Sequence, residues 1–248
     1  MSNSAASLQG KAALVTGAAT GIGKAIAAAL AAAAGGGEPQ PHPRTRGQDR
    51  RRYRDGRGDR DRGRRRHHQP GRIPGDGRAA AAEYGRWDIL VNNAAVAITK
   101  PFPEITEAEF DTSFAVNIKG VFHGLQLARE HLADNGRIIT ISSSTTGLML
   151  PGYAVHDATK GAVEQLTHIL SKEFGPRDIT VNAVSPGATE TETYRAGKSE
   201  QFLASLEAMS AFGRLGQPDE IAAVVAFLAS DAAGWVTAQT IRINGGTV

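Results

Sequence analysis

Three glycines, Gly17, Gly21 and Gly23, stand between a short apolar run and an alanine-rich segment. Glycine lets a strand turn sharply into a helix, and the missing side chains let a phosphate reach the backbone N–H groups at the helix N-terminus. The spacing therefore predicts that these glycines, with Thr20 and Ile22 between them, bind the pyrophosphate of a dinucleotide. A tight packing turn is the alternative interpretation of such a motif taken alone.

His156, four residues before Lys160, is another position whose residue type could do chemistry. An unperturbed imidazole titrates near pH ~6.5 and is a competent general acid. The ammonium group of Lys160 disfavours the protonated imidazole, which is the form that donates a proton. A solvated histidine, in a protein whose acid lies elsewhere, is the alternative interpretation.

Further motifs follow in an order that resembles the short-chain dehydrogenase/reductase family, including its 3-oxoacyl-[acyl-carrier-protein] reductase branch. After the glycine motif, residues 92–95 (NNAA) resemble the segment that ends the family's fourth strand, with Ala95 in place of a glycine. Residues 186–191 (PGATET) resemble the loop that contacts the nicotinamide carboxamide. The resemblance runs from about residue 10 to residue 248, apart from an arginine-rich stretch.

This resemblance implies hydride transfer between NAD or NADP and a carbonyl or alcohol, with a proton supplied to the developing alkoxide. The implied catalytic positions are Asn117, Ser143, His156 and Lys160. Ser143 is preferred to its two serine neighbours because the family's serine stands thirteen residues before the acid. The implied cofactor positions are Gly17, Thr20, Gly21, Ile22, Gly23, Asn93, Ala94, Lys160, Pro186, Gly187, Thr189 and Thr191.

The sequence departs from the family at the acid itself, because His156 stands where the family has a tyrosine. Tyr153 corresponds to a neighbouring, non-catalytic position. The histidine ring nitrogen lies closer to the backbone than a phenol oxygen, and a displacement of about 1 Å can cost on the order of a hundredfold in rate. We therefore expect an impaired oxidoreductase. A catalytically inactive homologue, which keeps cofactor binding or a structural role, is the alternative.

Strands and helices alternate along the chain. Apolar runs predict strands at 11–16, 88–91, 137–141, 179–184 and 240–243, and helical patterns lie at 24–34, 107–132, 157–174 and 218–230. This alternation predicts an α/β fold with a doubly wound parallel sheet of the Rossmann type, formed as a single domain over residues 1–248. Such sheets bind ligands at the carboxyl ends of their strands.

Residues 35–77 break the alternation, although a doubly wound domain needs a second strand, a second helix and a third strand there. Between Arg44 and Arg78 there are 14 arginines against five aspartates, a local charge of +9 in a chain of net charge +3. Three interpretations are open: an insert that binds nucleic acid, a flexible surface loop, or a translation in the wrong reading frame. We favour the last, because arginine codons CGN read one base later encode Ala, Val, Gly, Asp or Glu.

Composition excludes several classes of protein. The chain has no cysteine, so neither disulfides nor thiolate metal sites are available, and no metal is expected. No apolar run approaches the roughly 20 residues of a membrane span, and the N-terminal segment lacks a signal-peptide pattern, so we expect a cytoplasmic protein. The expected partner is a small carbonyl or alcohol substrate, not a membrane or nucleic acid. Analogy with the family predicts a homo-oligomer, a tetramer or dimer.

Overall fold

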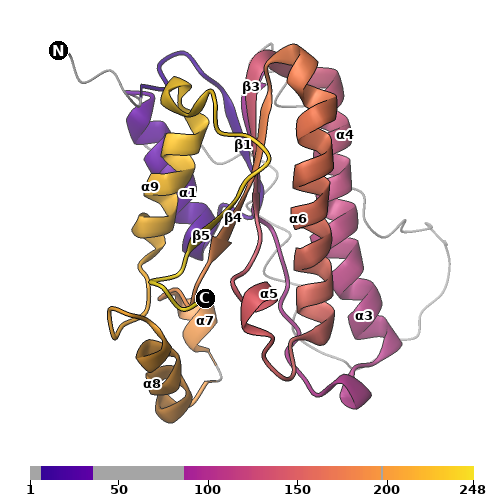
Figure 1. Ribbon diagram of the computed structural model, residues 1–248, viewed down its shortest axis with the longest axis vertical. Helices are drawn as coiled ribbons and strands as arrows, with labels where there is room; N and C mark the ends of the chain where they lie inside the picture. The colour runs from indigo at the N-terminus through magenta and orange to yellow at the C-terminus, as the bar shows by residue number, and fades with distance from the viewer. Residues whose placement is uncertain (1–6, 36–86, 197) are drawn as a thin grey trace, which may run out of the picture.

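The computed structural model describes residues 7–35, 87–196 and 198–248. In these ranges five strands form one parallel sheet, in the order β1-β2-β3-β4-β5. The strands are β1 (Ala13–Val15), β2 (Trp87–Asn92), β3 (Leu132–Ile141), β4 (Thr180–Pro186) and β5 (Thr240–Ile243). Helices cover both faces of the sheet (Figure 1), which confirms the predicted single α/β domain of the Rossmann type.

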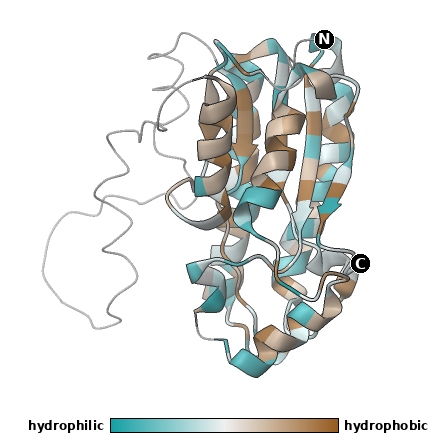
Figure 2. Ribbon diagram, turned by 90° about the vertical axis from the view of Figure 1, so that its left-hand side faces the viewer, coloured by the Kyte–Doolittle hydropathy of each residue, from teal (hydrophilic) through white to brown (hydrophobic). Residues whose placement is uncertain are grey.

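Each face of the sheet carries its own hydrophobic cluster, because successive side chains of a strand point to opposite faces. Ile89 and Val91 of β2 lie in one cluster, and Leu90 between them lies in the other. In Figure 2 the central strands and the sides of the helices that face them are predominantly hydrophobic. The strands are therefore buried on both sides, as the continuous apolar runs of a parallel sheet require.

Two helices, α1 (Gly21–Ala33) and α9 (Pro218–Ala229), lie side by side on one face (Figure 1). An apolar stripe of α1 faces the sheet, because Ile26 and Leu30 are buried in the cluster and Ile22 packs against it. Helix α9 starts at Pro218, a favoured first position, with a capping box formed by Gln217 and Glu220.

The opposite face is covered by α4 (Gly120–His131) and α6 (Ala154–Phe174). The single helix predicted at 107–132 is wrong in one respect, because α3 (Glu107–Phe114) joins α4 through a π-helical turn, η2 (Ala115–Lys119). Asn117 lies in that turn and is hydrogen-bonded to the backbone of Val96, which fixes the turn against the loop after β2. A hydrophobic pattern does not reveal such a local widening of a helix.

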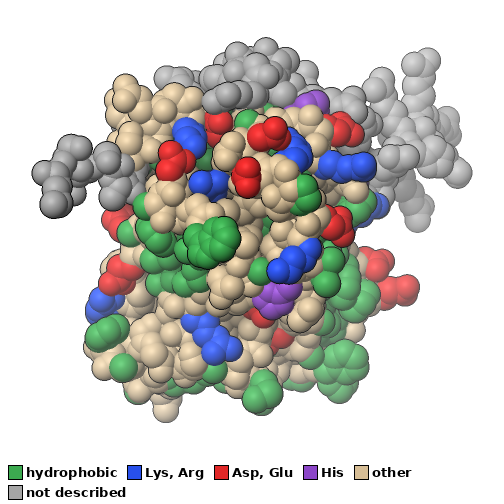
Figure 3. Space-filling model, turned by 45° about the horizontal axis from the view of Figure 1, so that its top comes forward, with side chains coloured by type: hydrophobic (Ala, Val, Ile, Leu, Met, Phe, Trp, Pro, Cys, Tyr) green, Lys and Arg blue, Asp and Glu red, His purple; other side chains and the backbone are tan. Residues whose placement is uncertain are grey.

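Short elements that the sequence did not predict gather at the carboxyl ends of the strands (Figure 1). They are α5 (Thr145–Leu148), α7 (Glu192–Arg195) and α8 (Glu200–Met209), with the 3-10 turn η1 (Phe102–Glu104). Two further 3-10 turns, η3 (Gly175–Arg177) and η4 (Asp231–Ala233), come before β4 and β5, at the amino ends of the strands. Leu203 and Leu206 of α8 pack on Leu215 in a small third cluster. The end of the molecule opposite these elements carries acidic and basic side chains interspersed (Figure 3).

The prediction of a second strand, a second helix and a third strand falls on a stretch that lies, from residue 36 onwards, outside the described residues. Within the described ranges, β1 is the first strand of the sheet and is paired with β2. Among the helices that the structure describes, none combines the length and the apolar composition needed to cross a membrane.

Candidate active site

The predicted site residues outside the helices follow the ends of neighbouring strands at one edge of the sheet, whereas Asn117 lies in η2 and His156 and Lys160 lie on α6. The register pairs Val15 with Val91, Asn92 with Thr140 and Ile141 with Val184. Because parallel strands lie about 4.8 Å apart and end at the same edge, the glycine turn, the 92–95 segment, the serines and the 186–191 loop are neighbours there. This is the edge where α/β sheets bind ligands.

The glycine turn has a backbone that only glycine fits. Gly17 and Gly21 have positive φ angles of 68° and 54°. A Cβ atom added at Gly23 would lie 2.3 Å from both Asn93 Nδ2 and Gly17 O, so no side chain can occupy that position. Thr20, the residue before α1, is extended and its side chain makes no capping hydrogen bond, which leaves the first turn of the helix open toward the site.

Thr16 and Asn93 hold the glycine turn against the end of β2. Asn93 Nδ2 donates to the carbonyl oxygens of Thr16 (3.0 Å) and Gly17 (3.2 Å). In return, the N–H groups of Asn93 and Ala94 donate to Thr16 Oγ1 at 2.9 and 3.0 Å. The sequence did not single out Thr16, although a hydroxyl residue between strand and glycine turn is a signal that could have found it.

The 186–191 loop faces the glycine turn from the other side. Pro186 ends β4, and the N–H of Gly187 donates to the carbonyl oxygen of Ile243 at 2.9 Å. Thr189 Oγ1 donates to Gly187 O at 2.9 Å, and Thr191 caps α7 by accepting from the N–H of Tyr194. A Cβ atom added at Gly21 would lie 3.3 Å from Thr191 Cγ2, so the loop and the turn are in contact distance.

The three consecutive serines have different surroundings. Ser142 is buried and donates to Glu164 Oε1 at 2.6 Å, and buried Ser144 donates to the carbonyl oxygen of Ser185 at 2.9 Å. Ser143 is only half-buried, and its Oγ lies 2.7 Å from Thr145 Oγ1. Of the three hydroxyl groups, that of Ser143, the position chosen by counting, is therefore the one outside the core.

Lys160 and Asn117 are buried and already bonded within the protein. Lys160 Nζ donates to the carbonyl oxygen of Ile141 at 2.7 Å, and burial lowers its pKa to about 8, against the opposite effect of Glu164. The side chain of Asn117 exchanges hydrogen bonds with the backbone of Val96 and donates to Thr159 Oγ1 at 3.0 Å. Asn117 therefore fixes the wall of the site in this structure.

His156 lies in the first turn of α6 and is only 8% exposed. Burial, and then the charge of Lys160, lower its pKa to about 4, whereas a hydrogen bond to the backbone of Val96 acts in the opposite direction. Nδ1 is buried with no hydrogen-bond partner, and the Tyr153 ring packs edge-on at 6.1 Å between centroids. Lys160 lowers the pKa of His156, as expected from the sequence. Burial of the ring lowers this pKa more, and the sequence alone does not reveal that burial. The imidazole is neutral at pH 7.

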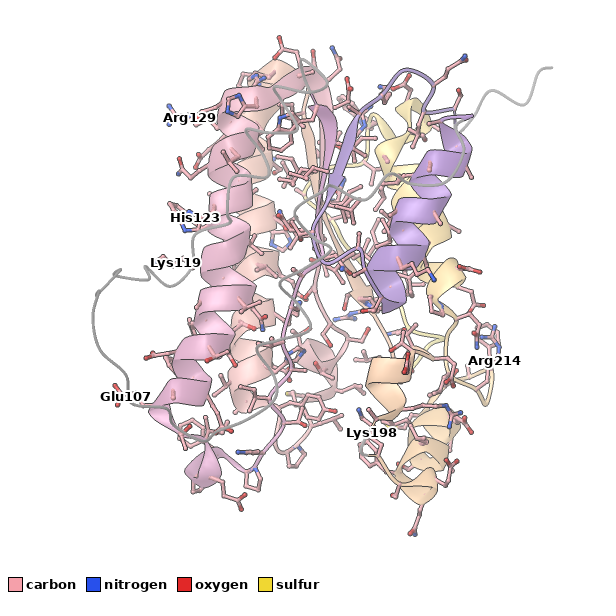
Figure 4. All side chains as sticks on the ribbon, turned by 180° about the vertical axis from the view of Figure 1, so that it is seen from behind. Glu107, Lys119, His123, Arg129, Lys198 and Arg214 are labelled. Carbon is pink, nitrogen blue, oxygen red and sulfur yellow. The ribbon has the colours of Figure 1, made fainter. Side chains whose placement is uncertain are left out.

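A cavity of about 450 Å³ opens beside Tyr153. Its lining comes from the loop after β2, the loop before α6 and the α7–α8 segment: Thr99, Lys100, Pro101, Pro151, Gly152, Tyr153, Ala196, Lys198 and Phe202. Lys198, labelled in Figure 4 at the end of the molecule that carries α7 and α8, places its Nζ 4.1 Å from the centroid of the Tyr194 ring. The cavity is partly apolar and partly cationic.

A Rossmann-type sheet with a glycine turn, and with hydroxyl and lysine side chains along its carboxyl edge, defines an α/β oxidoreductase. The family model described as enoyl-(acyl carrier protein) reductase matches residues 77–248. The chain belongs to the short-chain dehydrogenase/reductase family, which confirms the resemblance found in the sequence.

Known proteins resemble this chain to different extents. An uncharacterized oxidoreductase of Methylorubrum extorquens is 41% identical over 243 residues, which cover 96% of this chain and 98% of that protein. A short-chain type dehydrogenase/reductase of Picea abies is also 41% identical, over 66% of this chain and 62% of that protein, so the match spans less than two thirds of the relative. A solved angucycline C-6 ketoreductase with bound NADP is 34% identical, with a TM-score of 0.78 and coverage of 97% and 96%.

Proposed function

We propose that this protein is an NAD(P)-dependent oxidoreductase that moves a hydride between nicotinamide and a carbonyl or alcohol, and that residues 1–248 act as one cofactor-binding domain. One observation carries the proposal: the glycine turn and the 186–191 loop meet at the edge where Ser143 follows β3 and where Lys160, from α6, donates to Ile141, the last residue of β3. The ketoreductase relative solved with NADP supports a nicotinamide cofactor. The residue that chooses NAD or NADP follows the second strand of such folds, outside the described residues, so both are proposed.

The described residues fit a dinucleotide. Because a Cβ at Gly23 is sterically excluded and the first turn of α1 is open, Gly17, Thr20, Gly21, Ile22 and Gly23 would hold the pyrophosphate. Asn93 and Ala94 would border the ribose, Lys160 would donate to it, and Pro186, Gly187, Thr189 and Thr191 would hold the nicotinamide end. When bound, the cofactor supplies or accepts the hydride.

Three side chains would act on the substrate and on the developing negative charge: Ser143, His156 and Lys160. The half-buried hydroxyl of Ser143 donates a hydrogen bond to the carbonyl oxygen, where negative charge develops. Lys160 contributes a buried positive charge. His156 is a poor acid because its ring is neutral at pH 7, and this is the physical basis for impaired turnover.

The test is His156→Tyr. We expect the rate of NAD(P)H-dependent reduction, measured by absorbance with a panel of ketones, to rise on the order of a hundredfold, since the hydroxyl regains the reach that the ring nitrogen lacks. His168→Tyr makes the same change elsewhere on α6 and should leave the rate as it was. An unchanged rate in His156→Tyr, with dinucleotide bound, would remove the proposed role of this position.

A catalytically inactive homologue is the second candidate, favoured by the neutral, buried imidazole. It predicts dinucleotide binding, measured by calorimetry, without turnover of any ketone in the wild-type protein. Measurable reduction by the wild type would exclude it.

A homo-oligomer is also proposed. The outer side of α4 carries His123 and Arg129, with Lys119 at the end of η2 just before it (Figure 4), whereas α6 exposes an aliphatic residue, Ile169, at 60%. The proposal rests on analogy with the family, whose copies would meet through this helix. Light scattering that gives a monomer mass would contradict it.

A further inference from the structure

Three oxygen atoms form a hydrogen-bonded chain that leads from the half-buried serine to a carboxylate. Ser143 Oγ lies 2.7 Å from Thr145 Oγ1, and Thr145 Oγ1 lies 2.5 Å from Asp157 Oδ1. The chain joins the end of β3, the start of α5 and the first turn of α6. None of its members is fully buried, so the carboxylate end can exchange protons with water.

The hydrogen bonds between these three side chains can be donated in either of two directions, depending on whether Asp157 carries a proton. Each hydroxyl has one proton, and an ionised carboxylate has none. When Asp157 is ionised, Thr145 must donate to it, so Ser143 must donate to Thr145 and its proton points away from a substrate. When Asp157 is protonated, it donates to Thr145, which donates to Ser143, and the Ser143 proton is free to point at a carbonyl oxygen.

We propose that Asp157 is a positioning residue which, through Thr145, directs the Ser143 proton to the substrate oxygen and replaces it afterwards. The inference rests on the proposed function. When the carbonyl carbon receives a hydride, with its electron pair, from a reduced nicotinamide dinucleotide, the C=O π bond breaks and the oxygen becomes an alkoxide. The alkoxide takes the Ser143 proton, Ser143 takes that of Thr145, and Thr145 takes that of the Asp157 carboxyl group. The carboxylate then takes up one proton from the solvent, so the reduction consumes one H⁺ and yields the alcohol and the oxidised dinucleotide, and atoms and charge balance.

The surroundings of Asp157 raise the pKa of its carboxyl group above the ordinary value. Burial raises its pKa above the ordinary value, Thr145 lowers it, and the negative charge of Glu164 on the same helix raises it again. Burial, and then the negative charge of Asp157, raise the pKa of Tyr153 at the start of α6. Helix α5, which packs on this turn, has no ionisable side chain, and Arg242 of β5 approaches α5 at Gly147.

The hydrogen bonds that join Ser143, Thr145 and Asp157 also explain how a protein without the family's tyrosine could still supply a proton. His156 is neutral at pH 7, and its buried Nδ1 has no partner, so the imidazole holds no proton that is ready for transfer. Asp157, the next residue, reaches Thr145 on α5. Proton transfer from Asp157 through Thr145 to Ser143, the proposed relay, would therefore support slow reduction in the wild-type protein.

The first test is the pH profile of ketone reduction in the full-length protein with reduced dinucleotide. We expect the wild-type rate to rise as the pH falls through the pKa of Asp157. Asp157→Asn keeps a hydrogen bond to Thr145 but cannot release a proton, so its profile should be flat and its rate lower by about a hundredfold, the lower range for a positioned acid. Asp219→Asn, the same change at an exposed site on α9, should match the wild type.

The second test needs no turnover. In the cofactor-free protein, the Asp157 carboxyl carbon is titrated by NMR in the wild type and in Thr145→Val. Because the hydroxyl of Thr145 stabilises the carboxylate, its removal should raise the pKa of Asp157. An unchanged pKa would mean that the chain does not exist and would overturn the inference.

The outcomes separate the inference from the function on which it rests. If His156→Tyr reduces ketones but Asp157→Asn keeps the wild-type pH profile, the relay is wrong and the oxidoreductase assignment stands. If neither the wild type nor His156→Tyr reduces any ketone, the relay and the oxidoreductase assignment are both wrong, whatever the NMR titration gives. A structural role for Asp157 would be rescued fully by asparagine, which the relay forbids.

Discussion

Burial of His156 has a consequence for stability as well as for chemistry. Its pKa of about 4 in the folded protein, against 6.5 for an ordinary histidine, corresponds to about 3 kcal/mol. Because the folded-state pKa lies below the unfolded-state value, the unfolded chain binds the proton more tightly. We therefore expect the free energy of unfolding to be unaffected above about pH 6.5 and to fall as the pH falls from there toward about 4.

Urea denaturation between pH 4 and 8 measures this loss, with His156→Gln as the control that cannot be protonated. The wild type should lose up to about 3 kcal/mol more than the variant over the window. Equal slopes in the two proteins would show that the imidazole is solvated when folded.

At this scale, residue types and spacing identified most of the candidate site but not its hydrogen bonds. Lys160 was expected from the family resemblance and Ser143 by counting along the chain, and they lie at one edge of the sheet. Thr145 and Asp157 were missed because their contact joins α5 to α6 across twelve residues, and no periodicity marks it. A chain of hydroxyl groups is a property of the folded arrangement.

Among the elements, the glycine turn is the one most tightly specified, and Gly23→Ala tests it. The added methyl group would overlap Asn93 Nδ2 and Gly17 O, so the turn must move away from the end of β2. We expect a loss of dinucleotide affinity with a clear drop in melting temperature, measured by calorimetry and thermal denaturation. Dinucleotide affinity equal to that of the wild type would contradict the proposed pyrophosphate site.

Gly161→Ala is the matched control on α6. A Cβ at Gly161 meets no atom within 4 Å, and alanine in a helix interior is more stable than glycine by up to about 1 kcal/mol. The melting temperature should therefore rise slightly while dinucleotide affinity stays constant. A fall in stability would mean that the environment of α6 differs from the one described.

The long elements were predictable because they combine length with a regular apolar pattern. The last strand was predicted at its observed bounds, 240–243, and α9 to within one residue. Helix α6 starts three residues earlier than expected, which brings His156 into its first turn. Elements α5, α7 and α8 were missed because a helix of four to ten residues offers too few turns for a period to appear.

For the whole molecule, the positive charge is concentrated in one stretch, residues 44–78, and the remainder is acidic. Outside residues 44–78 the chain has a net charge of −6, and the face in Figure 3 mixes both signs without a basic stripe. The described part therefore offers no electrostatic surface for nucleic acid on that face. The excess positive charge that a nucleic-acid function would use lies in residues 44–78.

The arginine-rich stretch gives the last prediction. The family model begins at residue 77, where the stretch ends, and the match to the Picea abies relative covers only 66% of this chain. A chain in the wrong reading frame explains both facts, because a shift of one base turns CGN codons into codons for Ala, Val, Gly, Asp and Glu. We expect resequencing of the coding DNA to find one frame change near residue 35 and a compensating one near residue 78.

The corrected chain should then bind NAD(P)H more tightly than the present one, because the strand that selects the ribose group would be restored. Calorimetry of both chains measures the difference. A genuine insert predicts the opposite: an unchanged reading frame, equal dinucleotide affinity, and binding to a random oligonucleotide that weakens steeply with salt. The salt series decides, because a protein that neutralises several phosphates loses affinity by a factor of ten or more between low and physiological ionic strength, whereas dinucleotide binding to backbone N–H groups depends on salt far less.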